Sequence, residues 1–256
     1  NMKDHVNDGI TENLKWIITG ACSQINNSNK GSNGETLTKT STERWVDVLV
    51  HNKKLKGILG YHGQGPSANA NNSDYEVIDD FLAYSCDFDG TMEPMNIHDA
   101  WIKANAFYSH FMDDTLPCGL IVKENYDQED LYTSIISNEE VHCDYIYRYT
   151  AKLKKLVGNL GVVDYDYELI LPTALNAISS YYDISIDDAE EMIDDEVLII
   201  DRETFSAEGS YISNEVEEYI FNISSGNNIS SYNVDTDENN RIFIRYNSRT
   251  NNVEEF

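Results

Sequence analysis

Two short apolar segments, at 14–22 and 55–61, most constrain how this chain can fold. Both are rich in residues that favour strands, and each is followed by a polar or glycine-containing stretch, so we predict two buried strands. Between them, 41–44 (STER) provides a helix start, and apolar residues recur at helical spacing from 45 to 49. This order predicts two adjacent parallel strands joined by a right-handed crossover helix at 42–51.

The first half of the chain continues this alternation of helices and strands. Apolar residues at helical spacing predict helices at 75–85 and 97–107. A compact apolar segment predicts a strand at 118–122, and alternating polarity predicts another at 141–149. Such an order is typical of a mainly parallel sheet covered by helices. We therefore expect an α/β fold, with a mainly parallel sheet and flanking helices, over residues 1–150.

The pattern changes near residue 150. Short segments of alternating polarity, with only two further helices, predict a smaller antiparallel α+β module over residues 151–256. An acidic, asparagine-rich segment at 236–240 is expected to form the turn of the last hairpin. The helices are expected at 173–182 and 187–192, and the strands at 164–171, 196–200, 217–222, 231–235 and 241–246.

The chain is strongly acidic, with 45 Asp and Glu residues against 18 Lys and Arg and a formal net charge of −27. Such a surface repels phosphate backbones and anionic lipid, which argues against nucleic acid and membrane surfaces as partners. It favours a basic protein or peptide, or it serves only to keep the protein soluble. No apolar segment approaches the ~20 residues that a membrane span requires, so no span is expected.

Motifs for cofactors are absent from the sequence. It contains no Walker loop, no G-x-G-x-x-G and no H-E-x-x-H, so no organic cofactor or zinc site is expected. The four cysteines form no C-x-x-C pair, which predicts neither a zinc knuckle nor a disulfide framework and leaves the redox compartment open. They lie at positions 22, 86, 118 and 143.

Cys22 and His62 form the candidate catalytic pair. Cys22 lies at the end of the first predicted strand and His62 at the end of the second. Because the carboxyl ends of parallel strands meet at one edge of a sheet, we expect both side chains at that edge. Cys22 would be the nucleophile, His62 its base, and the backbone N–H groups of Gly63 and Gly65 would hold an oxyanion.

Other interpretations of these residues stay open. Cys22 can be a small buried apolar side chain, with His62 and Gly63 forming only a turn after the strand. Cys86 is a second candidate nucleophile, although its spacing places it at the end of a helix. His5 is a second candidate base, since it is the only histidine that precedes Cys22.

A cluster of carboxylates around Gly90 is the best candidate for a metal site. Asp87, Asp89 and Glu93 supply oxygen ligands of the kind that calcium prefers, so we expect a surface calcium site there. A second acidic segment, Asp235 to Asn239, copies the start of a calcium loop but lacks its later glycine and glutamate. We interpret that segment as a hairpin turn.

Three segments of the sequence resemble a known family. They are LKWIITGACSQ (14–24), RWVDVLVHNKKLKGILGYHG (44–63) and IHDAWIKANAFY (97–108). Together they resemble a bacterial family defined only as a domain of unknown function (DUF6345-like), with the general shape of the caspase, gingipain and clostripain cysteine peptidases (clan CD). The resemblance implies a caspase-like sheet with Cys22 at the nucleophile position. In those peptidases a His-Gly pair precedes the cysteine, whereas His62 and Gly63 follow it here.

The resemblance implies a caspase-like cysteine peptidase or amidase domain, either active or else incomplete or inactive, and its partner would be a basic protein or peptide. The alternatives are a non-catalytic bacterial surface or binding protein, and an acidic inhibitor-type partner of a basic protein. We expect a secreted or cell-surface location. The first residues lack the apolar core of a signal peptide, so a targeting segment would lie outside this sequence.

Overall fold

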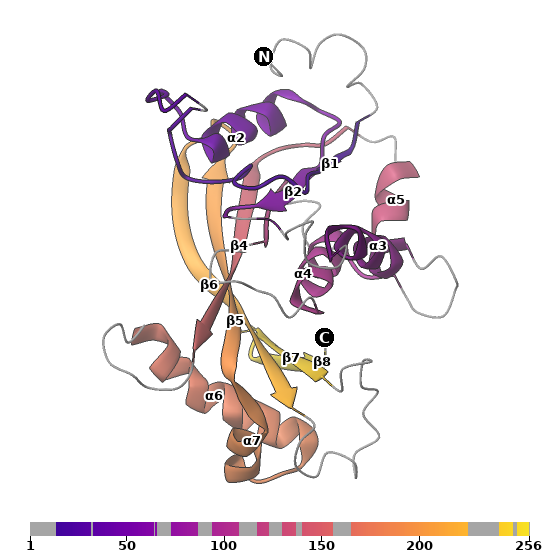
Figure 1. Ribbon diagram of the computed structural model, residues 1–256, viewed down its shortest axis with the longest axis vertical. Coiled ribbons are helices and arrows are strands. Elements are labelled where there is room, and N and C mark those ends of the chain that lie inside the picture. The colour runs from indigo at the N-terminus through magenta and orange to yellow at the C-terminus, as the bar shows by residue number, and fades with distance from the viewer. Residues whose placement is uncertain are drawn as a thin grey trace. The chain divides into compact units, whose positions relative to one another are not determined.

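The computed structural model describes residues 14–31, 33–63, 65, 73–86, 94–107, 117–122, 130–136, 140–155, 165–224, 241–247 and 250–255. Within these residues no helix is both long and apolar enough to cross a membrane, as expected from the sequence. Figure 1 shows the elements, which are β1 (Trp16–Ile18), α2 (Ser41–His51), β2 (Gly57–Tyr61), α3 (Ser73–Cys86), α4 (Ile97–Phe107), β3 (Pro117–Val122), α5 (Leu131–Ile136), β4 (Tyr145–Lys155), α6 (Tyr165–Tyr182), α7 (Ile186–Met192), β5 (Ile193–Ser206), β6 (Tyr211–Ser224), β7 (Arg241–Asn247) and β8 (Asn252–Glu255).

The first strands follow the predicted arrangement. β1 and β2 are adjacent and parallel, with Trp16 opposite Gly57 and Ile18 opposite Leu59. α2 lies between them in the chain. The prediction of a parallel pair with a connecting helix is therefore confirmed.

Local sequence explains where α2 begins. The Thr40 hydroxyl accepts the Glu43 backbone N–H at 3.1 Å, and the Glu43 carboxylate accepts the Thr40 backbone N–H at 2.6 Å. This capping box satisfies donors that the first helical turn leaves unpaired. The helix then buries Val46 and Leu49 against the sheet.

The expectation of a mainly parallel, caspase-like sheet is wrong. The sheet has eight strands in the order β1-β2-β3-β4-β5-β6-β7-β8. β3 pairs antiparallel with both β2 and β4, and β7 pairs antiparallel with both β6 and β8. Among the strand pairs whose register is described, β1–β2 is the only parallel one. The fold is α+β, with a mostly antiparallel sheet.

The connections give the physical reason for this difference. A single helix returns the chain to the edge where the previous strand began, which makes the next strand parallel. After β2 the chain instead forms two helices, α3 and α4, which pack against each other. The second helix carries the chain back again, so β3 runs opposite to β2. α5, with six residues, is too short to cross the sheet, and β4 runs opposite to β3.

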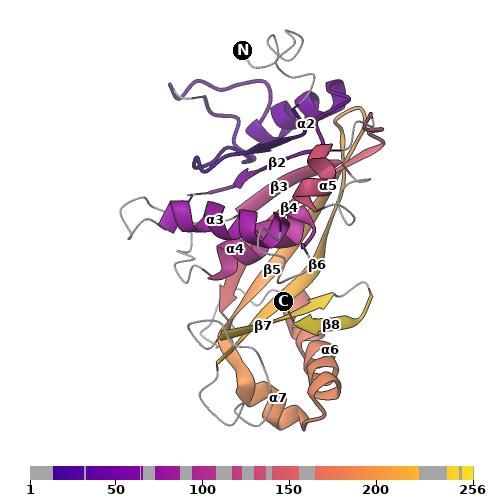
Figure 2. The same ribbon diagram turned by 90° about the vertical axis from the view of Figure 1, so that its right-hand side faces the viewer.

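Helices cover both faces of β2 and β3 (Figure 2). On one face, Val46 and Leu49 of α2 share a buried cluster with Ile58 of β2 and Leu120 of β3. On the other face, Trp101 of α4 packs with its ring centroid 5.5 Å from that of Tyr61 and 5.6 Å from that of Phe81 of α3. Burial on both faces explains why these strands are continuous apolar segments in the sequence.

Two glycines make room for aromatic rings on the neighbouring strand. Gly57 lies opposite Trp16, and Gly119 lies opposite Tyr149. A Cβ atom at either glycine would collide with the side chain of its partner. A larger residue at these positions would force the strands or the rings to shift.

The chain groups into two compact units, each with its own core. Unit 1 comprises Asn1–Ala151 and Arg202–Glu215, and unit 2 comprises Lys152–Asp201 and Val216–Phe256. In unit 2, α6 and α7 bury apolar side chains against β5, β6 and β7. The cluster is Ala174, Leu175, Ile178, Ala189, Val197, Ile199, Tyr219, Phe221, Ile244 and Tyr246.

The strand predicted at 164–171 is wrong, because residues 165–171 lie in α6. The alternation of polar and apolar residues at 164–169 favoured a strand, but Leu171, Leu175 and Ile178 are spaced three or four apart and continue the helical period. Pro172 lies inside the helix, although proline usually interrupts one. The strand and turn predicted at 231–240 lie outside the described residues.

Limited proteolysis tests whether residues 1–150 and 151–256 are independent domains. We expect that a protease site inserted between residues 155 and 165 yields two fragments that co-elute in native gel filtration. They should stay together because Phe205, which is in the second fragment, belongs to the buried core of unit 1. The Ala207 backbone N–H of the second fragment also donates to the Asp144 carbonyl of the first at 2.9 Å. The fragments should separate only in denaturant; separation in native buffer would favour two consecutive domains.

Candidate functional site

The carboxyl ends of β1 and β2 carry the candidate site. Beyond β1, the Ser23 backbone N–H donates to the Gly63 carbonyl at 2.6 Å, and the Ser23 hydroxyl donates to the same oxygen at 3.2 Å. The Gly65 backbone N–H lies 3.3 Å from Cys22 Sγ and donates to it. Cys22 is exposed. The structure therefore brings Cys22 and the segment after His62 to one edge of the sheet.

His62 follows β2 and is half-buried. Its Nδ1 atom lies 2.6 Å from an Arg148 guanidinium nitrogen and 3.3 Å from the Ile25 carbonyl oxygen. One nitrogen cannot accept from Arg148 and donate to Ile25 at the same time. Because a guanidinium only donates and its contact is the shorter one, we assign Nδ1 as the acceptor. The proton of the neutral ring is then on Nε2.

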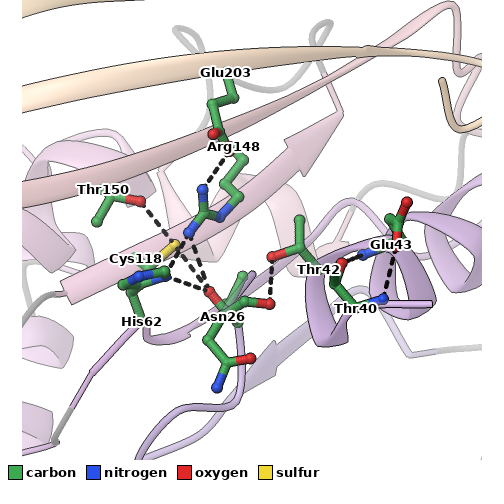
Figure 3. A network of polar contacts seen from close by, with 10 residues as sticks. Asn26, Thr40, Thr42, Glu43, His62, Cys118, Arg148, Thr150 and Glu203 are labelled. Atoms are coloured by element: carbon green, nitrogen blue, oxygen red, sulfur yellow. Dashed lines mark hydrogen bonds and ion pairs between the residues drawn. The ribbon is translucent and has the colours of Figure 1, made fainter. Parts of the chain in front are cut away.

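Arg148 occupies the centre of this network, as Figure 3 shows. Its side chain is buried and forms an ion pair with Glu203 of β5. Its other terminal nitrogen donates to His62 and, at 3.3 Å, to the Ile25 carbonyl. Burial acts to lower the pKa of Arg148, but the negative charge around it, including the Glu203 carboxylate and its hydrogen bond, outweighs burial and raises that pKa. The guanidinium stays charged and is paired, as a buried charge must be.

Cys118 is the second sulfur near this network, and its surroundings differ from those of Cys22. Its Sγ lies 3.4 Å from the Thr150 hydroxyl and 3.9 Å from the Ile25 carbonyl. Burial raises the pKa of the Cys118 thiol, although the nearby Arg148 opposes the effect. Cys118 is therefore a protonated, buried thiol and a poor nucleophile.

The sequence predicted only part of this network. It predicted that Cys22 and His62 lie at one edge of the sheet, but it did not predict that Arg148, Cys118 and Glu203 lie near them. Arg148 lies between two tyrosines in β4. A charged residue in such a segment indicates a buried side chain that is paired with an opposite charge. Nothing in the sequence identified Glu203 as that partner, because the pairing depends on strand order.

The other predicted site residues are placed as follows. Cys86 is the last residue of α3 and is half-buried, with its Sγ 3.8 Å from the Ser85 hydroxyl. Asp87, Asp89 and Glu93 lie outside the described residues, so the calcium site stays a prediction. His5 also lies outside them. The residues that are described contain no group of three or more His, Cys, Asp or Glu arranged to hold a metal ion.

No family model, no curated protein and no solved structure matches this chain. The resemblance to caspase-like peptidases therefore stays a prediction from three sequence segments. Function has to be argued from the site itself, because a fold hosts many activities.

Breaking the Arg148–Glu203 pair should destabilise the protein. Glu203→Leu leaves a buried guanidinium without its counterion, a change that typically costs roughly 3–5 kcal/mol. We expect the lower end of that range, since the Glu203 side chain is 20% exposed. The double variant Glu203→Leu/Arg148→Met, which removes both charges, should lose less than the sum of the single variants.

The free energy of unfolding in urea measures these effects. Glu140→Gln is the matched control, because the Glu140–Lys53 pair is exposed and should matter by less than about 0.5 kcal/mol. A loss for Glu203→Leu no larger than that for Glu140→Gln would contradict the structural role given to Arg148.

Alkylation distinguishes the cysteines by their surroundings. Iodoacetamide at neutral pH should modify Cys22 first, because its sulfur is exposed and accepts a backbone N–H. Cys118 should react only after unfolding, because it is buried and its thiol pKa is raised. Peptide mass spectrometry over time gives the order, and urea-unfolded protein, in which every cysteine reacts, is the control. Labelling of Cys118 before Cys22 would contradict this assignment.

Proposed function

We propose that this protein is a cysteine-dependent hydrolase of peptide or amide bonds, with Cys22 as the nucleophile. The observation that carries the proposal is the exposed Cys22 sulfur at the end of the parallel β1–β2 pair, with the Gly65 backbone N–H 3.3 Å away. The thiolate is the nucleophilic form of cysteine, and the exposure of Cys22 leaves this side chain accessible to a substrate. His62 lies on the neighbouring strand end, in the segment that also holds Gly63 and Gly65.

The reaction would proceed by acyl transfer. Cys22 loses its thiol proton to solvent, and the thiolate forms a bond to the substrate carbonyl carbon. The carbon–nitrogen bond breaks and the leaving amine takes a proton from water, which leaves a thioester on Cys22. Water then hydrolyses the thioester, releases the carboxylic acid and restores the thiol.

The proposed substrates are basic proteins or peptides. The net charge of −27 attracts cationic chains and repels anionic ones. Substrates with Lys or Arg near the scissile bond should therefore react faster than acidic ones. High salt should reduce this preference, because surface electrostatics are screened.

A non-catalytic binding protein is the second candidate, and one observation favours it. The lone pair of His62 Nδ1 is used by Arg148, so His62 in this tautomer offers Cys22 no proton acceptor. An exposed thiol without a base reacts slowly, and an acidic surface is suited to binding basic partners. Under this alternative, basic peptides bind but are not cleaved.

Intact-protein mass spectrometry with basic and acidic reporter peptides separates the two candidates. The hydrolase proposal expects a thioester adduct on Cys22, cleavage of the basic peptide, and loss of both in Cys22→Ala. Cys86→Ser is the control variant and should keep both the adduct and the cleavage. Cys86 is the last residue of α3, and none of the described contacts joins it to the segment that contains Cys22. Binding of the basic peptide with neither adduct nor cleavage would leave the binding-protein candidate.

A further inference from the structure

The strands of unit 1 bring four polar groups to the face that α2 covers. Successive residues of β3 and β4 face opposite sides of the sheet. The register places Leu120 opposite Arg148 and Cys118 opposite Thr150, so the side chains of Cys118, Arg148 and Thr150 share one face. His62 follows β2 and meets Arg148 on the same face (Figure 3). A charged arginine, a neutral thiol and an imidazole therefore share one partly water-excluded region.

The contacts of Arg148 leave little freedom to His62. One terminal nitrogen of the guanidinium donates to Glu203, and the other carries two protons for two acceptors, His62 Nδ1 and the Ile25 carbonyl. Arg148 is held by Glu203 and is always protonated, so it can only donate. A proton on His62 Nδ1 would point at these donors in either form of the ring, and in the imidazolium form it would also place a second positive charge beside the guanidinium.

We propose that Arg148, held by Glu203, is a positioning residue that fixes His62 as the neutral Nε2–H tautomer, so that His62 acts as a hydrogen-bond donor and not as a general base. This inference rests on the proposed function for its catalytic meaning. In that function, His62 would take no proton from Cys22 at Nδ1 during attack on the substrate carbonyl carbon. The state of the ring itself does not depend on catalysis and can be measured in the unreacted protein.

Nitrogen-15 NMR of protein labelled in its histidine rings tests the tautomer directly. We expect the His62 ring, assigned by comparison with His62→Gln, to show an unprotonated Nδ1 and a protonated Nε2 throughout about pH 5.5–8, a range in which an ordinary histidine changes its charge. Signals from a protonated Nδ1, as the neutral Nδ1–H tautomer or as imidazolium at the acidic end, would overturn the proposal. This readout needs no activity, so its failure is distinct from a failure of the hydrolase proposal.

Arg148→Met and Arg202→Met form the matched pair of variants. Arg202 is also buried, also paired with a glutamate (Glu215), and lies on the neighbouring strand β5, but it is not among the contacts of His62 described. Arg148→Met should give a mixture of both neutral tautomers at high pH and imidazolium near pH 6. Arg202→Met should leave the His62 signals as in the unmodified protein. Equal effects of the two variants would indicate a general structural disturbance and would overturn the assignment.

The pH dependence of Cys22 alkylation gives a second readout. The titratable or charged groups that the described contacts place around His62 are Arg148 on β4, Cys118 on β3 and, through Arg148, Glu203 on β5. Because His62 takes no proton under this proposal, the alkylation rate of the unmodified protein should show no step that comes from an imidazole. Arg148→Met should add a step near pH 6.5, where a free histidine titrates. Such a step in the unmodified protein would count against the proposal.

Discussion

A charged guanidinium buried in unit 1, that of Arg148, is the constraint on which the rest of this unit depends. Arg148 cannot lose its proton, and an unpaired charge in a protein interior costs several kcal/mol. Every acceptor around it is therefore needed: the Glu203 carboxylate, the Ile25 carbonyl and His62 Nδ1. These groups come from β5, from the loop after β1 and from the end of β2. One buried charge thus connects β4 to three other segments of the same unit.

The two cysteines Cys22 and Cys118 differ in their position relative to this charge. Cys118 is buried beside Arg148, and its raised pKa shows that burial outweighs the attraction of the guanidinium. Cys22 lies outside this network, where its sulfur is exposed and meets the Gly65 backbone N–H. Two thiols on adjacent parts of one sheet are thereby suited to different roles, one to packing and one to reaction. His62 lies between the two environments and takes its protonation state from Arg148.

Much of the local structure could be predicted from the sequence, and the direction of the later strands could not. The β1–α2–β2 unit follows from two apolar segments with a capped helix between them, because each signal is local. Whether β3 runs with or against β2 depends on how many helices the connection contains and how they pack, which is not encoded in any one segment. The resemblance to caspase-like peptidases led to the same wrong expectation of a mainly parallel sheet.

The sequence by itself determined that Cys22 and His62 follow two neighbouring strands, because parallel strands joined by one helix present their carboxyl ends at one edge. It could not determine what those residues meet there. Arg148 and Glu203 are 55 positions apart in the chain, and His62 and Arg148 are 86 apart. Their contacts exist because β3 lies antiparallel between β2 and β4, and because β5 lies next to β4. Hydrogen bonds act over about 3 Å, so the protonation of His62 was decided only when the tertiary structure placed a permanent donor beside it.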